Sequence, residues 1–418
     1  MPQIADPGIA RPALRVLFIN DTSRDGGPGK TLLDIVKFLD PAEIHRSVLL
    51  PRPGIVSQKL IRSSAADEMI YEPGLIENIF APLSRPLARA DLNASWFLKI
   101  PRALGNMALA VRGLARLVRR TRLERYDVIF CNGTMANFTG GLLAAFTGTP
   151  TVWHVLYTGT GLLSPLHAML AAGRHVKTII CVSKPTALQF RHCPDKVQLI
   201  HDAIDIAEFD GTRAAPILRG ELGLPEGSII FGAHGRILPS KGFAELVKAA
   251  RIFFDRLNVE TRGRCHFVVI GDTPQDRARD TRAECIALAD RLGLGGKVHF
   301  IGFRTDIPAH VSDFDVAVVP SIYQDPLPLA VLEAMALSRP VIGFDVGGMG
   351  EMIEDGVTGR LVPAGDVVRL AEACLSYVPD EGLRARHGAA GRARIERDFN
   401  ARLHAGVIAA ELARAAGR

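Results

Sequence analysis

The sequence predicts an α/β protein made of two doubly wound parallel-sheet domains that face a cleft. Three observations support this fold class. The chain has 418 residues, more than one domain usually holds, and 48% of them are hydrophobic, which is enough for two cores. Short runs of β-branched residues alternate with helix-length segments. These runs form two series, and a polar stretch separates them.

The first series lies in the N-terminal half, where each strand is expected as a short apolar run. It starts with residues 14–20, and a helix is expected next, near residues 31–39. The other strands of this series are expected at residues 47–50, 128–131, 151–155, 178–182 and 197–200. Because these runs are continuously apolar, we expect helices on both faces of the sheet.

The second series repeats the pattern after the polar stretch. Its strands are expected at residues 229–235, 266–271, 298–301, 316–320, 341–344 and 361–363. The stretch 205–225 is rich in glycine and suits a junction better than a core element. We therefore place the first domain at residues 1–205 and the second at 206–399. Ligands of open parallel sheets gather at the carboxyl ends of the strands, so the expected site is a cleft between the domains.

Basic residues are concentrated in one part of the chain. Residues 1–205 hold 24 Lys or Arg against 16 Asp or Glu, whereas residues 206–418 hold 26 against 28. Nearly all of the excess lies in residues 81–126, where ten basic residues meet only Asp91 and Glu124. Apolar residues recur there at helical spacing, and arginines fall on another face. The apolar positions are Leu104, Met107, Val111, Leu114 and Val118, and the arginines are Arg112, Arg116, Arg119 and Arg120.

Two interpretations of this basic helix stay open. In the first, it packs on a sheet and exposes a solvated arginine face. In the second, residues around 102–122 dock peripherally on anionic lipid. Nucleic acid is a less favoured partner, because interleaved aromatic residues are absent there apart from Trp96 and Phe97.

Composition excludes several other classes of protein. No stretch approaches the roughly 18 uninterrupted apolar residues that cross a bilayer, and residues 1–12 contain Asp6 where a signal peptide needs an apolar core. The six cysteines show no C-x-x-C pair or metal-ligand spacing. We therefore expect a cytoplasmic protein with reduced thiols and no metal, in contact with the inner face of a membrane at most.

Residues 327–337 are expected to form a helix with Pro328 in its first turn. Glu333 is the only charged residue of this segment. Because a buried carboxylate is costly without a partner, we expect the hydroxyl groups of a ligand to compensate it. The free N–H groups at the start of such a helix would also suit a phosphate.

Two loops of the second domain are candidates for binding an anion. Arg236 and Lys241 stand on the loop after the first strand of the second series. A guanidinium that grips phosphate oxygens in two places, together with a mobile ammonium, suits a diphosphate, although a solvated loop is the ordinary alternative. The run Gly347-Gly348-Met349-Gly350 follows a later strand and is a second candidate, because its N–H groups could cradle phosphate or sugar hydroxyls.

The N-terminal glycine turn, residues 25–31, superficially resembles a P-loop. The P-loop spacing requires a glycine where Arg24 stands, which excludes nucleotide hydrolysis of that type. Gly27 is instead expected to let the backbone approach the substrate closely.

Histidines and acids near the strand ends are weaker candidates. His154 ends an apolar strand and is expected to face the cleft, where a core histidine and a functional histidine are equally open interpretations. His201, Asp202 and Asp205 precede the junction and are interpreted as hinge or turn residues.

Taken together, these motifs resemble the family 4 glycosyltransferases of the GT-B fold, which has two Rossmann-like domains. The resemblance covers nearly the whole chain. Its most specific motifs are Gly235-Arg236…Lys241-Gly242, Asp325-x7-Glu333-Ala-Met-Ala, Asp345-Val-Gly-Gly and Glu354-Asp-Gly-Val-Thr-Gly359…Gly365-Asp366. The resemblance implies a retaining transferase that moves a hexose from a UDP- or GDP-linked sugar to a glycan or lipid-linked acceptor, in polysaccharide or glycoconjugate biosynthesis. It also implies a C-terminal helix, about residues 400–418, that returns to the first domain.

The same resemblance implies a role for each site residue. Arg236 and Lys241 would hold the diphosphate, Glu333 the ribose hydroxyls, and the region of Asp325 the sugar hydroxyls. His154, near the reacting sugar, joins Arg236, Lys241 and Asp325 as the catalytic set. Further donor contacts implied are Gly27, Gly235, Gly302, Phe303, Leu327, Leu329 and Ala330, with Gly347 and Gly348 as the phosphate or sugar loop.

The chain departs from the pattern of this family at two positions. Asp325 stands where the family usually has Glu, and Pro328 where Gly is frequent. In the implied scheme the leaving phosphate takes the proton of the acceptor, so neither a covalent nucleophile, nor a metal, nor a cofactor beyond the nucleotide sugar is needed. Two alternatives stay open: a sugar-nucleotide epimerase or hydrolase of the same fold, and a nonenzymatic glycan- or lipid-binding subunit.

Overall fold

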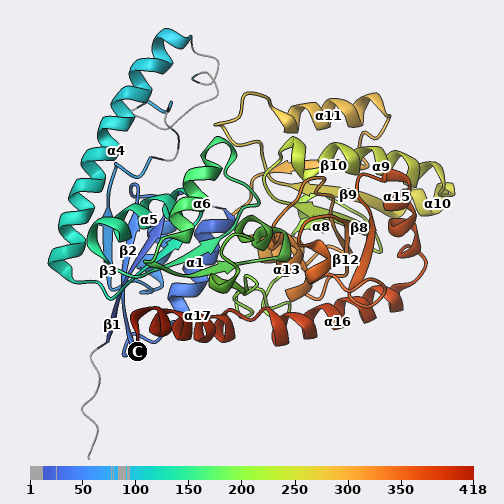
Figure 1. Cartoon of the computed structure of the whole chain (residues 1–418). Helices are drawn as coiled ribbons and strands as arrows, with labels where there is room; N and C mark the ends of the chain where they lie inside the picture. The colour runs from blue at the N-terminus through green and yellow to red at the C-terminus, as the bar shows by residue number, and fades with distance from the viewer. Residues whose placement is uncertain (1–12, 25, 77, 79, 83–90, 92–94) are drawn as a thin grey trace, which may run out of the picture.

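The protein contains two parallel sheets that lie side by side, each with helices on both faces (Figure 1). The computed structural model describes residues 13–24, 26–76, 78, 80–82, 91 and 95–418. Predictions that concern residues 1–12, Asp25, Arg85 and Arg89 lie outside the described residues. The predicted fold class, two doubly wound α/β units, is confirmed.

The first sheet has seven parallel strands in the order β3-β2-β1-β4-β5-β6-β7. The strands are β1 (Leu14–Asn20), β2 (Ile44–Leu50), β3 (Glu68–Tyr71), β4 (Val128–Asn132), β5 (Thr151–Val155), β6 (Val176–Cys181) and β7 (Val197–Leu199). The helices of this half are α1 (Gly27–Phe38), α2 (Ile55–Arg62), α4 (Trp96–Glu124), α5 (Thr134–Thr147), α6 (Ser164–Ala172) and α7 (Lys184–Ala187), with short 3₁₀ turns η1 (Gly161–Leu163), η2 (Leu188–Phe190) and η3 (Pro194–Lys196).

The second sheet has six parallel strands in the order β10-β9-β8-β11-β12-β13. The strands are β8 (Ile229–His234), β9 (Cys265–Ile270), β10 (Val298–Gly302), β11 (Val316–Val319), β12 (Val341–Asp345) and β13 (Gly359–Pro363). Its helices are α8 (Leu218–Glu221), α9 (Phe243–Asp255), α10 (Val259–Arg264), α11 (Thr281–Arg291), α12 (Ile307–Val311), α13 (Leu329–Ala336), α14 (Met349–Met352), α15 (Val367–Ser376) and α16 (Glu381–Asp398), with the 3₁₀ turn η4 (Pro239–Lys241).

One strand is missing from the sequence prediction. Strand β3 has four residues, begins with a glutamate and pairs with β2 alone among the described strands. A half-exposed edge strand needs no continuous apolar run, so the pattern that reveals central strands is absent here.

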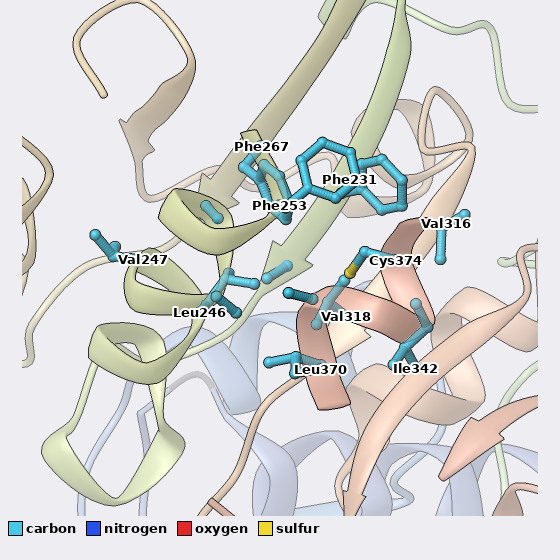
Figure 2. Packing of buried hydrophobic residues seen from close by; sticks show 14 of the residues in the cluster. Phe231, Leu246, Val247, Phe253, Phe267, Val316, Val318, Ile342, Leu370 and Cys374 are labelled. Atoms are coloured by element: carbon cyan, nitrogen blue, oxygen red, sulfur yellow. The ribbon is translucent and has the colours of Figure 1, made fainter. Parts of the chain in front are cut away.

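An aromatic cluster forms the core between the second sheet and its outer helices (Figure 2). Phe231 on β8 and Phe267 on β9 stack with ring centroids 5.1 Å apart, and Phe253 of α9 meets both rings edge-on. Leu370 and Cys374 of α15 join the same cluster. This packing is what fixes α9, and with it the loop before α9, on the sheet.

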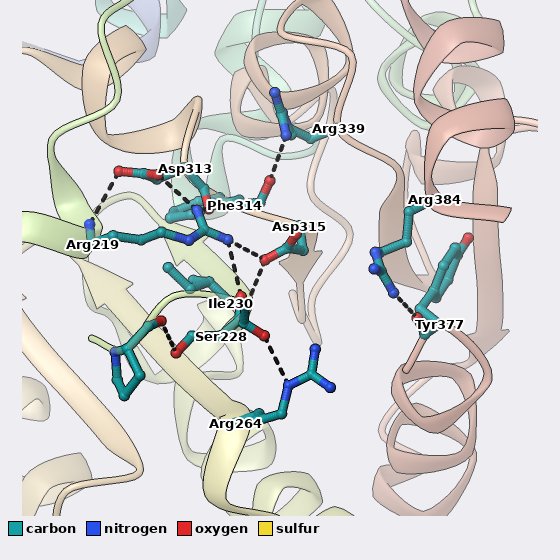
Figure 3. Close-up of polar contacts among 12 residues, drawn as sticks. Arg219, Ser228, Ile230, Arg264, Asp313, Phe314, Asp315, Arg339, Tyr377 and Arg384 are labelled. Atoms are coloured by element: carbon teal, nitrogen blue, oxygen red, sulfur yellow. Dashed lines mark hydrogen bonds and ion pairs between the residues drawn. The ribbon is translucent and has the colours of Figure 1, made fainter. Parts of the chain in front are cut away.

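The stretch that we predicted as a junction is anchored to the amino ends of the second sheet (Figure 3). Arg219 of α8 donates to Asp313 and Asp315, with ion-pair distances of 2.7 and 2.6 Å. Asp315 also accepts the backbone N–H of Ile230 at 2.8 Å. This network lies at the end of the sheet opposite the carboxyl ends of β8 and β11, so it stabilises the scaffold away from the expected site.

The last helix, α17 (Ala401–Ala416), returns to the first sheet and packs on α1 (Figure 1). The chain crosses back beside Ile204, whose N–H donates to Phe399 O at 2.9 Å and whose carbonyl accepts from Ala401 N at 3.0 Å. Ile408 and Leu412 of α17 belong to the core of the first sheet. The domain limits at residues 205 and 399 stay a prediction.

The second half of helix α4 packs against the rest of the protein, whereas its first half is mostly exposed. Near its end, Arg116 pairs with Glu72 at 2.6 Å and Arg120 pairs with Glu68 at 2.5 Å. Further towards its start the apolar residues that we expected to pack on the sheet are exposed instead: Leu104 is 67%, Met107 56% and Val111 62% exposed. The interpretation of a helix packed on a sheet with a solvated arginine face therefore fails for the first half of α4, which extends beyond the sheet (Figure 1).

Among the helices that the structure describes, none combines the length and the apolarity needed to cross a bilayer. All six cysteines are free, and all except the half-buried Cys193 are buried.

We predict that Ile408→Ala lowers the free energy of unfolding by about 2–5 kcal/mol, because the change leaves a cavity under α17. Val407→Ala on the same helix is the matched control. Because Val407 is 47% exposed, this change should alter the free energy of unfolding by about 0.5 kcal/mol or less. Urea unfolding of both variants checks this, and equal losses would contradict the packing described for α17.

Candidate functional site

A cleft of about 1170 Å³ separates the two sheets, as predicted. Its walls are loops that follow the carboxyl ends of β1 and β5 on one side, and of β8, β9 and β11 on the other, together with the start of α13. Because parallel strands direct their carboxyl ends to one edge, residues that are far apart in the sequence meet here.

Two candidate catalytic residues contact each other in the wall formed by the second sheet. Lys241 Nζ lies 2.5 Å from Asp325 Oδ2. Asp325 also accepts from Ser321 Oγ and from Tyr323 OH, each at 3.0 Å. Arg236 lines the same wall, is exposed, and has no hydrogen bond or ion pair to any other residue that the structure describes. The ammonium of Lys241 is therefore held by a carboxylate, whereas the guanidinium of Arg236 faces the cleft unpaired.

Glu333 has a partner inside the protein, which corrects our expectation that ligand hydroxyls alone compensate it. Glu333 Oε2 lies 2.7 Å from His234 Nε2, and both residues line the cleft. Burial by itself would raise the pKa of Glu333, but His234 and, more weakly, the charges of Lys30 and Lys59 hold that pKa below its ordinary value. Glu333 is therefore a carboxylate at neutral pH and has acceptor capacity left for a ligand.

The helix that carries Glu333 begins two residues later than we predicted. Pro328 is the N-cap of α13 and is not part of its first turn. Leu329 and Ala330 open the helix and line the cleft, as does Leu327 just before it. N–H groups in a first turn have no partner within the helix, so those of Leu329 and Ala330 are available to an anion in the cleft.

The glycine loop at Gly347 and Gly348 lies outside the lining of the cleft, contrary to the role that we expected for it. A Cβ atom at Gly347 would lie 2.2 Å from Asp325 O, and one at Gly348 would lie 1.9 Å from Pro326 O. The N–H of Gly348 donates to Asp325 O at 2.9 Å. These glycines allow the backbone to pack against the segment of Asp325, so they shape the site from behind.

Of the other predicted donor contacts, some line the cleft and one does not. Gly27, Gly235 and Phe303 line the cleft, and Phe303 is 55% exposed. A Cβ atom at Gly27 would lie 3.9 Å from Leu329, which shows how closely the two walls approach here. Gly302 does not line the cleft, and its φ of 77° indicates a glycine required by the turn after β10.

His154 is completely buried, which corrects the expectation that it faces the cleft. Its Nδ1 lies 2.8 Å from Asn132 Oδ1, and the amide of Asn132 donates to Pro28 O, so this pair holds the first turn of α1 from behind. Its Nε2 lies 3.2 Å from Asp202 Oδ1, and Asp202 does line the cleft. Any effect of His154 on a ligand must therefore pass through Asp202 or through the glycine turn.

Polar contacts also bridge the two walls at the margins of the cleft. Arg24 pairs with Asp276 at 2.7 Å. Glu351 of the second half accepts the N–H of Lys184 at 2.9 Å and pairs with His201 at 3.0 Å. His201, which we interpreted as a hinge residue, thus contacts a carboxylate of the other half.

Comparison with known proteins identifies the family. Residues 215–394 match the family model "Glycosyl transferases group 1", and residues 71–208 match "Glycosyltransferase Family 4". The D-inositol 3-phosphate glycosyltransferase of Salinispora tropica is 32% identical over 406 residues, which covers 91% of this chain and 79% of that protein. The chain belongs to the group 1 glycosyltransferases.

Solved structures show the same fold at low sequence identity. HepE of Anabaena, in a complex with UDP-glucose, superposes with a TM-score of 0.76 at 22% identity, and the match covers 96% of this chain and all of HepE. WaaG, a glycosyltransferase involved in lipopolysaccharide biosynthesis, gives 0.64 at 16% identity over 95% of this chain and 99% of WaaG. This glycosyltransferase therefore has the GT-B arrangement that the sequence predicts.

Sequence reasoning missed two polar residues of the cleft, His234 and Lys30. His234 lies at the end of an apolar strand, which is the same signal that singled out His154. Lys30 lies within the glycine turn, where we considered only the glycines. Its Nζ is 2.8 Å from Glu208 Oε2, 3.7 Å from Asp34 Oδ2 and 4.9 Å from the ring centre of Phe209.

Lys30 belongs to a charged cluster where α1 meets the chain after Ile204. Asp205 pairs with Lys37 at 2.5 Å, so the cluster contains three carboxyl groups and two ammonium groups. Burial is the largest cause that raises the pKa of Asp34 to about 7; Glu208 and Asp205 act in the same direction, whereas Lys30 and Lys37 oppose the rise. This glycosyltransferase therefore holds a proton at Asp34 in weakly acidic solution.

We predict that the stability of wild type relative to Asp34→Asn falls as the pH rises from 5 to 8. The pKa of Asp34 is raised from 3.8 to about 7 on folding, so between these values the folded protein binds a proton that the unfolded chain releases. The stability of wild type relative to Asp34→Asn should fall by at most about 1.4 kcal/mol per pH unit. Thermal unfolding at both pH values measures it. Asp195→Asn, at an exposed position, is the control and should show no such trend. A constant difference between wild type and Asp34→Asn would contradict the prediction.

Proposed function

We propose that this glycosyltransferase retains the configuration of the sugar and moves a hexose from a UDP- or GDP-linked donor to a glycan or lipid-linked acceptor, in polysaccharide or glycoconjugate biosynthesis. The observation that carries the proposal is the meeting of Arg236, Lys241 and Glu333 in one cleft, beside the first turn of α13. The structures of HepE with UDP and with UDP-glucose support a nucleotide sugar as the donor.

The diphosphate of the donor would bind between Arg236, Lys241 and the start of α13. The unpaired guanidinium of Arg236 is available for two hydrogen bonds to phosphate oxygens. Lys241 is on a flexible stem and exchanges part of its contact with Asp325 for the diphosphate. Because negative charge grows on the phosphate as the sugar leaves, these fixed positive groups stabilise the transition state more than the ground state.

The ribose would bind Glu333, which His234 holds in place. A carboxylate can accept hydrogen bonds from two neighbouring hydroxyls, and the His234 contact uses only part of the acceptor capacity of Glu333. The low pKa of Glu333 keeps it in the accepting form throughout the neutral range.

The contacts of Asp325 favour a positioning role over attack on the sugar. Its two oxygens already accept three hydrogen bonds, from Lys241, Ser321 and Tyr323. A carboxylate so engaged is a weak nucleophile, which supports a reaction in which the leaving phosphate accepts the proton of the acceptor on the same face of the sugar. We propose no cofactor beyond the nucleotide sugar, since side chains and helix N–H groups supply the positive charge.

The exposed half of α4 supports peripheral contact with an anionic membrane. Leu104, Met107 and Val111 form an exposed apolar stripe along the helix. Arg112 is exposed next to this stripe and Arg119 is exposed further along the helix; neither has an ion pair with any other described residue. An exposed apolar stripe with flanking cations is the pattern of a helix that lies in a membrane interface.

Binding of nucleotides tests the donor site. We predict that one of UDP, GDP and ADP binds the wild type in calorimetry, and that Lys241→Ala weakens this binding roughly 10-fold or more, because a charge-assisted hydrogen bond contributes about 1.5–3 kcal/mol. Glu333→Ala should also weaken it. Lys248→Ala is the matched control, since Lys248 is an exposed lysine on α9. Normal binding by both site variants, or no binding of any nucleotide by folded wild type, would refute the proposed donor site.

Vesicle binding tests the membrane contact. We predict that wild type sediments with vesicles of anionic lipid at low salt, and that the double variant Arg112→Glu and Arg119→Glu sediments markedly less. Arg369→Glu on α15 of the second half is the control for charge reversal elsewhere and should bind like wild type. Equal sedimentation of all three proteins would argue against docking through α4.

A further inference from the structure

A second cavity, of about 230 Å³, adjoins the cleft on the side of the first sheet. It lies between α4, α5 and the loop after β3, and it shares Asp21 and Met135 with the cleft. The two spaces are therefore neighbours, and nothing in the proposed donor site uses the smaller one.

The walls of this cavity are apolar. Helix α4 contributes Ala110 and Leu114, α5 contributes Phe138 and Leu142, and the loop after β3 contributes Leu75. Of all the described residues that line it, Asp21 and Thr139 are the two with polar side chains. Such a space gives little hydrogen bonding to a sugar or an inositol ring but suits a hydrocarbon chain.

Close packing beneath the cavity prevents it from collapsing. Gly113 of α4 meets Gly74 so closely that a Cβ atom on either glycine would lie 2.7–2.8 Å from the Cα of the other. Glu72 accepts from Arg116 at 2.6 and 2.9 Å and from the N–H of Gly74 at 2.8 Å. These contacts fix the distance between α4 and the sheet, so the apolar space is part of the scaffold.

An apolar path leads from the protein surface into the cavity. Met107 and Val111 line the cavity and also belong to the exposed stripe of α4. At the other end of the cavity stands Asp21, whose Oδ2 accepts the N–H of Met135 at 3.0 Å at the start of α5. A molecule that follows this path has its chain against apolar walls and its polar head at Asp21, beside the cleft.

We propose that this cavity binds the hydrocarbon chain of the acceptor, so that the acceptor is an amphiphile whose head group carries the hydroxyl to be glycosylated. The proposal deepens the proposed function. That the bound molecule is the acceptor rests on the proposed function, whereas the binding of a hydrocarbon chain rests on the cavity alone. Asp21 then lies where the head group enters the cleft and serves as a positioning residue for its hydroxyl.

The test uses neutral n-alkyl β-D-glucosides with hexyl, heptyl and octyl chains, below their micelle concentrations, in calorimetry with the full chain. Each added methylene should tighten binding about fourfold until the cavity is full, which corresponds to ~0.8 kcal/mol per buried CH₂. These measurements use the wild-type protein, so they do not depend on whether a variant folds.

A matched pair of variants shows where the alkyl chain binds. Ala110→Phe fills the cavity and should abolish the gain with chain length, whereas Ala108→Phe, at an exposed position two residues earlier on the same helix, should keep it. Circular dichroism of both variants checks that α4 remains folded. If the affinity of Ala110→Phe still increases with alkyl chain length, the alkyl chain binds on the exposed stripe and the proposal is overturned.

Nucleotide binding by the same samples separates this proposal from the proposed function. Wild type that binds UDP but shows no gain with chain length overturns the hydrocarbon site and leaves the donor site intact. A gain that Ala110→Phe removes, in a protein that binds no nucleotide, supports the hydrocarbon site and refutes the proposed donor site.

Discussion

The crossing of the chain between its two halves is the constraint on which the site depends. The polypeptide passes from the first sheet to the second after Ile204 and returns at Phe399, and two backbone hydrogen bonds join these passages. Because α17 then packs into the core of the first sheet, the halves are tied at two adjacent points. Both sheets consequently present the carboxyl ends of their strands to one cleft, and the candidate residues in it come from the loops and helix starts that this arrangement brings together.

Charges in the cleft are largely paired before any ligand arrives. Glu333 is held by His234, Lys241 by Asp325, and Lys30 by Glu208. Pairing avoids the cost of leaving a charge desolvated, and it also fixes the position of each group. An anion that enters the cleft would compete with Asp325 for Lys241. Arg236 carries no such contact within the described residues and is the group most available to an incoming anion.

The two sides of the cleft differ in character. The wall formed by the second sheet carries charged groups that are mostly paired, whereas the space beyond Asp21 is apolar and continues into the exposed stripe of α4. The docked half of α4 is anchored by Glu72 and Glu68, and this anchoring lets the other half extend beyond the sheet. One long helix thus links the scaffold, the small cavity and an exposed surface of apolar and basic residues.

The sequence by itself determined the two parallel sheets, their central strands, the cleft, and the loop that carries Arg236 and Lys241, because buried strands and glycine turns leave local patterns. It did not determine β3, since a short edge strand leaves no apolar run. Only the tertiary structure decided which polar groups are partners. His154 and His234 give the same local signal, yet one is buried behind Asp202 and the other lines the cleft with Glu333. The sequence predicted that Gly347 and Gly348 approach a ligand, but in the structure they approach the backbone of Asp325 and Pro326, and only the fold decides what lies opposite a glycine. The exposed stripe of α4 has the periodicity of a core face, and only the position of the helix beyond the edge of the sheet reveals that it faces outwards.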